Sequence, residues 1–226
     1  MTPAADAALA RLLQLASPAL PVGAYSYSQG LESAVEAGIV TDAASARRWI
    51  EDVLEQSVAT MEAPVLARIL RAWKSGDAQA AARWNALFLA GRETAELRAE
   101  TVQMGYSLAR LLADLGEDGE GRLAAIDEIA YPAAFAAAAA AWNIDEARAI
   151  TAYLWSWIEN QVMAAVKLLP LGQTEGQRML LALGERIGPL AERAAALEDD
   201  ALCNFAPGLA MLSSTHETQY SRLFRS

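Results

Sequence analysis

Residues 146–169, "EARAITAYLWSWIENQVMAAVKLL", decide the fold class. Apolar side chains recur along this stretch with the period of an α-helix. They form a stripe of Ile150, Leu154, Trp157, Ile158, Gln161 and Ala165, and Trp155, Val162 and Val166 make the segment apolar almost all round. A helix of this kind is covered on every side, so it belongs in the middle of a helical bundle. Asp145 is placed to cap its first turn, and Pro170 ends it.

The rest of the chain carries the same signal. No stretch sustains the alternation of apolar and polar residues that is typical of a β-strand. We therefore expect an all-α fold, a single domain spanning residues 1–226, and a bundle of roughly ten helices. The expected helices, with approximate bounds, are 5–16, 26–38, 42–58, 64–74, 78–90, 92–115, 131–142, 146–169, 174–198 with a break at Gly188-Pro189, and one opened by Pro207. Two starts have the spacing of a capping box, namely Ser26 with Gln29 and Thr174 with Gln177.

Composition limits the classes of partner. The 226 residues include 18 basic and 28 acidic side chains, which give a formal net charge of −10 and a pI of about 4.6. Such a chain repels phosphate backbones and anionic lipids, so we expect protein partners, with no nucleic acid and no membrane. The first residues lack a basic signal-peptide start, and the uncharged run 129–144 is too short to cross a bilayer. We therefore expect a cytoplasmic protein, and its single cysteine, Cys203, fits a reducing compartment.

Motifs for catalysis and for nucleotide binding are missing from the sequence. It has no Walker-type glycine loop, no nucleophile elbow and no paired Cys or His motif for zinc. We therefore assign no catalytic residues. One alternative is a small serine hydrolase in which Ser26 or Ser28 acts with His216, the only histidine. Another is a transient soft-metal site, for nickel or copper, that Cys203 and His216 would form with a second subunit, because these two residues cannot complete a metal site within one chain.

The tail, residues 213–226 with the sequence "SSTHETQYSRLFRS", carries two arginines in an otherwise acidic chain. On a helical wheel, one face of the tail carries His216, Tyr220, Leu223 and Phe224, and the opposite face carries Arg222 and Arg225. Burying an apolar side chain contributes about 1.5–3 kcal/mol, whereas ordering each backbone residue costs about 1–2 kcal/mol. The tail is therefore marginal as a helix on its own, and a partner surface would stabilise it.

Four longer stretches carry a family resemblance. They are "LLQLASPALPVGAYSYSQGLE" (12–32), "RETAELRAE" (92–100), "WIENQVMAAVKLLPLGQTEGQ" (157–177) and "HETQYSRLFRS" (216–226). Together they resemble the urease accessory protein UreF family. Because they lie near both ends and in the middle, the resemblance covers essentially the whole chain. One departure is Thr215, where the family often has a basic residue.

The resemblance implies a function and a set of partners. Proteins of this family are all-α homodimers that form a complex with UreD, also called UreH, and with the nickel-carrying GTPase UreG. The complex activates apo-urease by inserting nickel, and the accessory protein is the scaffold that couples GTP hydrolysis to this transfer. The resemblance therefore implies a chain that is not an enzyme and binds no cofactor alone, while the complex handles nickel and GTP.

The resemblance also implies contact residues. Lys167, Gln173 and Arg178 are expected to face UreG, and Lys167 acts there either on GTP hydrolysis directly or by positioning UreG. The residues expected to face UreD, or to dock the tail, are Tyr25, His216, Tyr220, Arg222, Leu223, Phe224 and Arg225. A separate prediction comes from spacing, since Arg92 and Glu96 are placed to form an exposed ion pair on a helix.

Overall fold

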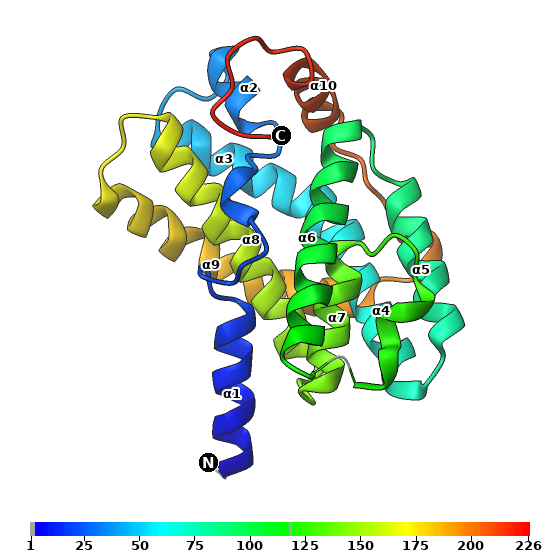
Figure 1. Ribbon diagram of the computed structural model, residues 1–226. Helices are drawn as coiled ribbons and strands as arrows, with labels where there is room; N and C mark the ends of the chain where they lie inside the picture. Colours follow the sequence, from blue (N-terminus) through cyan, green and yellow to red (C-terminus); the bar gives the residue numbers. More distant parts are fainter. Residues whose placement is uncertain (1–2, 118) are drawn as a thin grey trace.

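The computed structural model describes residues 3–117 and 119–226, and these residues form helices and loops without a β-strand (Figure 1). The all-α prediction is confirmed. The α-helices are α1 (Pro3–Leu15), α2 (Leu31–Glu36), α3 (Ala43–Val53), α4 (Ala63–Ser75), α5 (Ala78–Ala90), α6 (Ala95–Asp114), α7 (Tyr131–Ala141), α8 (Glu146–Leu168), α9 (Gln173–Ala196) and α10 (Pro207–His216). Short 3₁₀ turns are η1 (Ala24–Ser26), η3 (Gly119–Ala125) and η4 (Asp199–Ala201).

Helix α8 lies in the middle of the bundle, as its sequence predicts (Figure 1). All members of its predicted stripe are buried. The carboxylate of Asp145 caps it by accepting the N–H of Arg148 at 2.9 Å. Helix α9 runs back along α8, and the two approach closely at Gly176, where a β-carbon would come within 2.9 Å of Val166.

Helices α4 and α7 complete the core around α8. The alanine run of α7 is almost entirely buried, and its small side chains let α4 and α6 pack closely against it. Gly105 of α6 faces the start of α7. A β-carbon there would lie 2.8 Å from the carbonyl carbon of Ala130 and closer still to the carbonyl oxygen of Ile129. A larger residue at position 105 therefore requires the backbone to move.

One continuous helical run spans residues 43–75. Helix α3 leads into a π-helical stretch, η2 (Leu54–Glu62), which continues directly into α4. The predicted gap between 58 and 64 is wrong, because the π-helical turns accommodate the missing N–H of Pro64 without ending the helix. Stretches of π-helix are frequent at functional sites, and this one places Glu62 in the interior.

The start of α2 differs from the prediction. The helix begins at Leu31, behind Gly30, and the capping box expected at Ser26 and Gln29 does not form. Gln29 instead adopts a left-handed backbone conformation with a φ of 51°, and its side chain bonds to distant residues. Local spacing was therefore a poor guide where a loop residue serves a long-range contact.

Helix α9 also corrects two local predictions. It begins at Gln173 with Gly172 as its N-cap, so Thr174 is already inside the helix and does not cap it. The expected break at Gly188-Pro189 is absent, and the helix runs through both residues. Proline removes one internal hydrogen bond, which a helix of 24 residues tolerates when it packs along a neighbour.

Helix α1 projects away from the bundle and touches α7 and α8 (Figure 1). Leu15, at its last position, is buried, whereas Leu9 and Leu13 are exposed. Residues 16–30, called here the N-terminal loop, then lead across the bundle to α2. Within the described residues, no helix combines the length and the apolarity that crossing a bilayer requires.

Candidate functional site

The tail packs against the N-terminal loop and α2 (Figure 1). Helix α10 ends at His216, and residues 217–226 follow as turns and extended chain. The predicted helical face from His216 to Phe224 is therefore wrong. The physical reason is that the N–H groups of Leu223 and Phe224 bond to a side chain of α2 instead of to a preceding helical turn.

Glu32 of α2 is that side chain. Its Oε1 accepts the N–H of Leu223 at 2.7 Å, and its Oε2 accepts the N–H of Phe224 at 2.9 Å. Hydrogen bonds to an ionised acceptor are stronger than bonds between neutral groups. Because the Glu32 carboxylate is buried, it depends on these donors for solvation. Glu32 therefore anchors the backbone of the tail.

His216 is fully buried between two carboxylates. Its Nδ1 lies 2.7 Å from Oε2 of Glu96, and its Nε2 lies 3.3 Å from Oε2 of Glu32. Arg222 adds an ion pair, with Nη1 2.6 Å from Oε1 of Glu96. The tail is thus held to α2 and α6 by contacts with the carboxylates of Glu32 and Glu96.

The main-chain oxygen of Ser226 is bound by the N-terminal loop. It accepts the N–H of Ser28 at 2.7 Å, the N–H of Gln29 at 3.1 Å and the hydroxyl of Ser28 at 2.6 Å. Ser226 and Ser28 are both fully buried. Three donors on one oxygen fix the position of this residue, so the tail is anchored at both His216 and Ser226.

The serine hydrolase alternative gains no support from this geometry. The hydroxyl of Ser28 donates to Ser226, and the carbonyl of Ser26 accepts the N–H of Arg225 at 2.8 Å. His216 directs both ring nitrogens at carboxylates, so neither nitrogen is free to act as a base for a serine.

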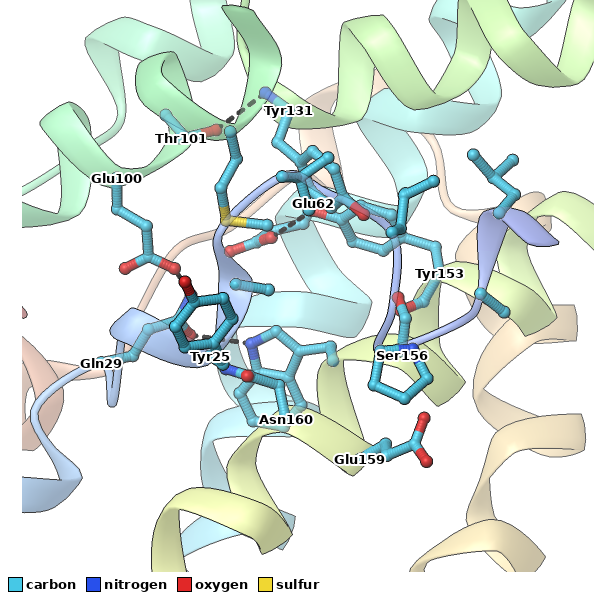
Figure 2. A pocket seen from close by; sticks show the side chains of 18 of the residues that line it. Tyr25, Gln29, Glu62, Glu100, Thr101, Tyr131, Tyr153, Ser156, Glu159 and Asn160 are labelled. Carbon is cyan, nitrogen blue, oxygen red and sulfur yellow. Dashed lines mark hydrogen bonds between the residues drawn. The ribbon is translucent and has the colours of Figure 1, made fainter. Parts of the chain in front are cut away.

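Glu100 of α6 links the tail to the interior. Its Oε2 accepts the hydroxyl of Ser226 at 2.8 Å, and its Oε1 accepts Nε2 of Gln29 at 2.7 Å (Figure 2). The Nε1 of Trp157 in turn donates to Oε1 of Gln29 at 2.7 Å. Burial raises the pKa of Glu100 to about 7, although both hydrogen bonds oppose the rise. Burial and the nearby Glu100 charge also raise the pKa of Tyr27.

The predicted ion pair between Arg92 and Glu96 is wrong. Arg92 pairs with Glu62, with Nη1 2.9 Å from Oε1, and both side chains are buried. A buried cation needs a buried anion, and η2 supplies one from a distant part of the sequence. Tyr153 donates to the other oxygen of Glu62 at 2.6 Å (Figure 2), and burial together with the Glu62 charge raises the pKa of Tyr153. Glu96 is left to bind the tail.

Lys167 connects the two sets of predicted contact residues. Its Nζ lies 4.5 Å from the centroid of the Phe224 ring, which is a cation–π contact, while the side chain stays exposed. Gln173 and Arg178 are exposed on the first turns of α9, and Arg178 pairs with Glu175 at 2.8 Å. In the part of the chain that the structure describes, we find no bond that joins Lys167 to Gln173 or Arg178.

The predicted UreD-facing residues fall into a buried and an exposed group. His216 and Phe224 are buried against the body of the protein. The others are exposed, and Arg222 among them also pairs with Glu96; they are Tyr25, Tyr220, Arg222, Leu223 and Arg225. Four of these, Tyr220, Arg222, Leu223 and Arg225, form what we call the outer face of the tail. The tail is thus anchored by its backbone and buried side chains while it presents basic and apolar groups to solvent.

Cys203 and His216 occupy different environments. Cys203 is exposed in the segment before α10, and its N–H donates to the carbonyl of Thr60 in η2. His216 is enclosed by Glu32 and Glu96. Among the described residues, no three side chains of His, Cys, Asp or Glu form a cluster suited to a metal ion.

Comparison with known proteins identifies the family. The family model for UreF matches residues 40–184. The chain belongs to the UreF family. The urease accessory protein UreF of Azoarcus sp. (strain BH72) is 63% identical over 223 residues, 96% of this chain and 95% of the relative. The proteins of that name from Dechloromonas aromatica (strain RCB) and Methylobacillus flagellatus are 55% and 52% identical, each over 96% of this chain and 97% of the relative.

Membership in the UreF family confirms the resemblance and establishes an accessory role in urease maturation. Sequence reasoning missed the acids that hold the tail of this UreF-family chain, namely Glu32, Glu96 and Glu100. A signal for two of them was present. Glu96 and Glu100 are four residues apart on one helix, where like charges repel unless each has a partner elsewhere.

Proposed function

We propose that this chain is the scaffold of a urease maturation complex with UreD, UreG and apo-urease. In this proposal a homodimer binds UreD through the N-terminal loop and the tail. It presents Lys167, with Gln173 and Arg178, to UreG. The complex handles nickel and GTP, and the scaffold, which is not itself an enzyme, couples GTP hydrolysis to nickel insertion in the cytoplasm.

The observation that carries this proposal is the contact between Lys167 and the tail. The ammonium of Lys167 lies over the ring of Phe224, and the backbone of Phe224 is anchored by Glu32. A partner that covers or moves the tail therefore changes the surroundings of Lys167 directly. Two partners that bind on either side of this contact would be coupled through it, as a scaffold between UreD and UreG requires.

The outer face of the tail suits a protein partner. Arg222 and Arg225 gather positive charge on a chain whose formal net charge is −10. Tyr220 and Leu223 add exposed apolar surface to the same tail. Tyrosine and arginine are enriched among the residues that dominate protein interfaces. We infer that the partner surface is acidic around an apolar centre, and that association slows as salt is added.

Reconstitution of apo-urease activation with purified UreD and UreG tests the proposal. We expect nickel-dependent urease activity when this chain is present and little activity without it. Deletion of residues 217–226, which contain no helix, should leave the circular dichroism of the helices nearly unchanged and abolish capture of UreD. Capture at full strength by the truncated protein would refute the docking role of the tail.

The role of Lys167 needs a variant of its own. Lys167→Ala removes the cation over Phe224, so it should lower urease activation while the complex with UreD survives. Lys167→Arg keeps a cation over the ring and should retain most of the activation. Full activation by Lys167→Ala would exclude Lys167 from the surface that contacts UreG.

A further inference from the structure

A cavity of about 250 Å³ lies beneath the N-terminal loop and between α6 and α8 (Figure 2). Its walls are mainly apolar and include Leu15, Leu20, Val22, Phe88, Leu97 and Met104. Tyr25 and Met163 also line it and are exposed, so they mark its opening to solvent. A concave apolar pocket with a few polar groups is the usual form of a site for a small molecule.

Arg92 lies in the wall of this cavity and is the one cationic side chain among the described residues that line it. Its side chain is 5% exposed, its Nη1 donates to Glu62, and its guanidinium carbon lies 4.4 Å from the centroid of the Phe88 ring. Its Nε and Nη2 are buried and have no hydrogen-bond partner among the described residues. These two nitrogens form one edge of the guanidinium, the edge that binds both oxygens of a carboxylate in parallel.

Three acids line the cavity, namely Glu62, Glu100 and the half-exposed Glu159, and the two buried ones do not offer a comparable site for a cation. Glu62 accepts from Arg92 through one oxygen and from Tyr153 through the other. Glu100 is held in the same way by the two hydrogen bonds described above. A cation would have to break these bonds, whereas an anion would complete the unpaired donors of Arg92. The ligand should carry a single charge, because Glu62 and Glu100 would repel a dianion in this buried setting.

We propose that this cavity binds a small monocarboxylic acid with a single ring-sized apolar body, and that Arg92 anchors its carboxylate. The size fits, since an apolar cavity of about 150 Å³ holds benzene. Aromatic side chains of Phe88, Tyr131 and Trp157 line the space that the ring would occupy. The pKa of Glu100, raised to about 7, lets this acid take up a proton when an anion enters nearby. The ligand would brace the N-terminal loop that carries Tyr25.

Calorimetric titration of the full chain with benzoate and with benzamide tests the proposal. Benzamide has the same ring and nearly the same shape, but it is neutral and offers one acceptor oxygen. We expect benzoate to bind with one ligand per chain, and benzamide to bind at least about tenfold more weakly. Equal affinities would overturn the role of the carboxylate, and so would the absence of benzoate binding up to about 10 mM.

Two variants locate the ligand. Arg92→Lys keeps a cation opposite Glu62 but lacks the two-donor edge, so it should weaken benzoate by about tenfold or more and weaken benzamide, which offers one acceptor oxygen, much less. Ala16→Leu enlarges a residue of the wall without changing Arg92, so it should weaken both ligands. Unchanged benzoate affinity in either folded variant would overturn the proposal. If Arg92→Lys does not fold, Ala16→Leu and the comparison of the two ligands decide the question.

Discussion

The Glu32→Gln substitution removes the charge that anchors the tail backbone while it keeps the shape of the side chain. In the native protein the carboxylate accepts the N–H groups of Leu223 and Phe224 at 2.7 and 2.9 Å and faces His216 at 3.3 Å. The glutamine amide retains one acceptor oxygen, so it can hold one of the two backbone N–H groups. The other N–H group loses its partner, and His216 loses one of its two acids.

The size of the effect follows from these contacts. A hydrogen bond to a charged group contributes about 1.5–3 kcal/mol, against about 1 kcal/mol for a neutral one. Losing one such bond and weakening another should lower the free energy of local opening of the tail by about 2–4 kcal/mol. Because 1.36 kcal/mol corresponds to a factor of ten, the amides of Leu223 and Phe224 should exchange roughly 30- to 1000-fold faster.

Hydrogen exchange followed by mass spectrometry measures this opening. Peptides from residues 217–226 should lose protection, while peptides from α8 should keep it, because α8 is held by its own core contacts. Glu36→Gln is the matched control, since Glu36 lies exposed on the same helix and carries the same charge. Native exchange rates in the tail of Glu32→Gln would refute the anchoring argument, as would an equal effect of Glu36→Gln.

Three further predictions concern the body of the protein. The pKa of Glu100 rises from 4.5 to about 7 on folding, so the stability that its protonated form contributes is fully present below pH 4.5 and is lost as the pH rises through 7. Urea unfolding should therefore show that Glu100→Gln is more stable than the native chain by about 3 kcal/mol at pH 8 but not at pH 4.5. Equal effects at the two pH values would contradict this. Gly105→Ala should lower the free energy of unfolding by more than about 4 kcal/mol or prevent folding. Gly188→Ala is the control, because a β-carbon at position 188 meets open space and should raise the free energy of unfolding by about 0.5–1 kcal/mol. Similar melting temperatures for the two variants would show that the close contact at position 105 is unimportant. Asp145→Ala removes the cap of α8 and should cost about 1 kcal/mol, or about 2–4 °C in melting temperature, and an unchanged melting temperature would disprove the capping role.

Local patterns predicted the helices because the forces that shape them act over short stretches of chain. The stripe from Ile150 to Ala165 is apolar at helical spacing, and every member is buried. Asp145 caps the first turn of that helix through a bond three residues away. The failures at this level occur at η2 and α9, where Pro64 and Pro189 are tolerated because neighbouring helices support the run.

Long-range pairing could not be read from the same patterns. Spacing placed Arg92 opposite Glu96, but Arg92 pairs with Glu62, 30 residues earlier in the chain. The tail stops being helical where Glu32, 191 residues from Leu223, competes for its N–H groups. Such partners are chosen by how distant helices pack, and no local period records that choice.

The candidate site was therefore predicted in part. Tyr25, Lys167 and the tail were nominated from the resemblance, and the structure shows Lys167 against Phe224, a contact that neither residue suggests in the sequence. The helical wheel placed His216 and Phe224 on one face with Tyr220 and Leu223, so it could not separate the two buried anchors from the two exposed side chains. The cavity beside Arg92 could not be predicted for a simpler reason, since its walls come from segments as far apart in the chain as α1 and α8.

The bond between Ser28 and Ser226 has a consequence for synthesis, because 198 residues separate its two ends. The ribosome makes the N-terminal loop before the tail, and domains begin to fold while translation continues. Helices α2 to α9 therefore form while Glu32 and Glu100 still lack their partners from the tail. The surface that both segments build together arises only after residue 226 has left the ribosome. A nascent chain thus cannot offer that surface to a partner before its core is complete.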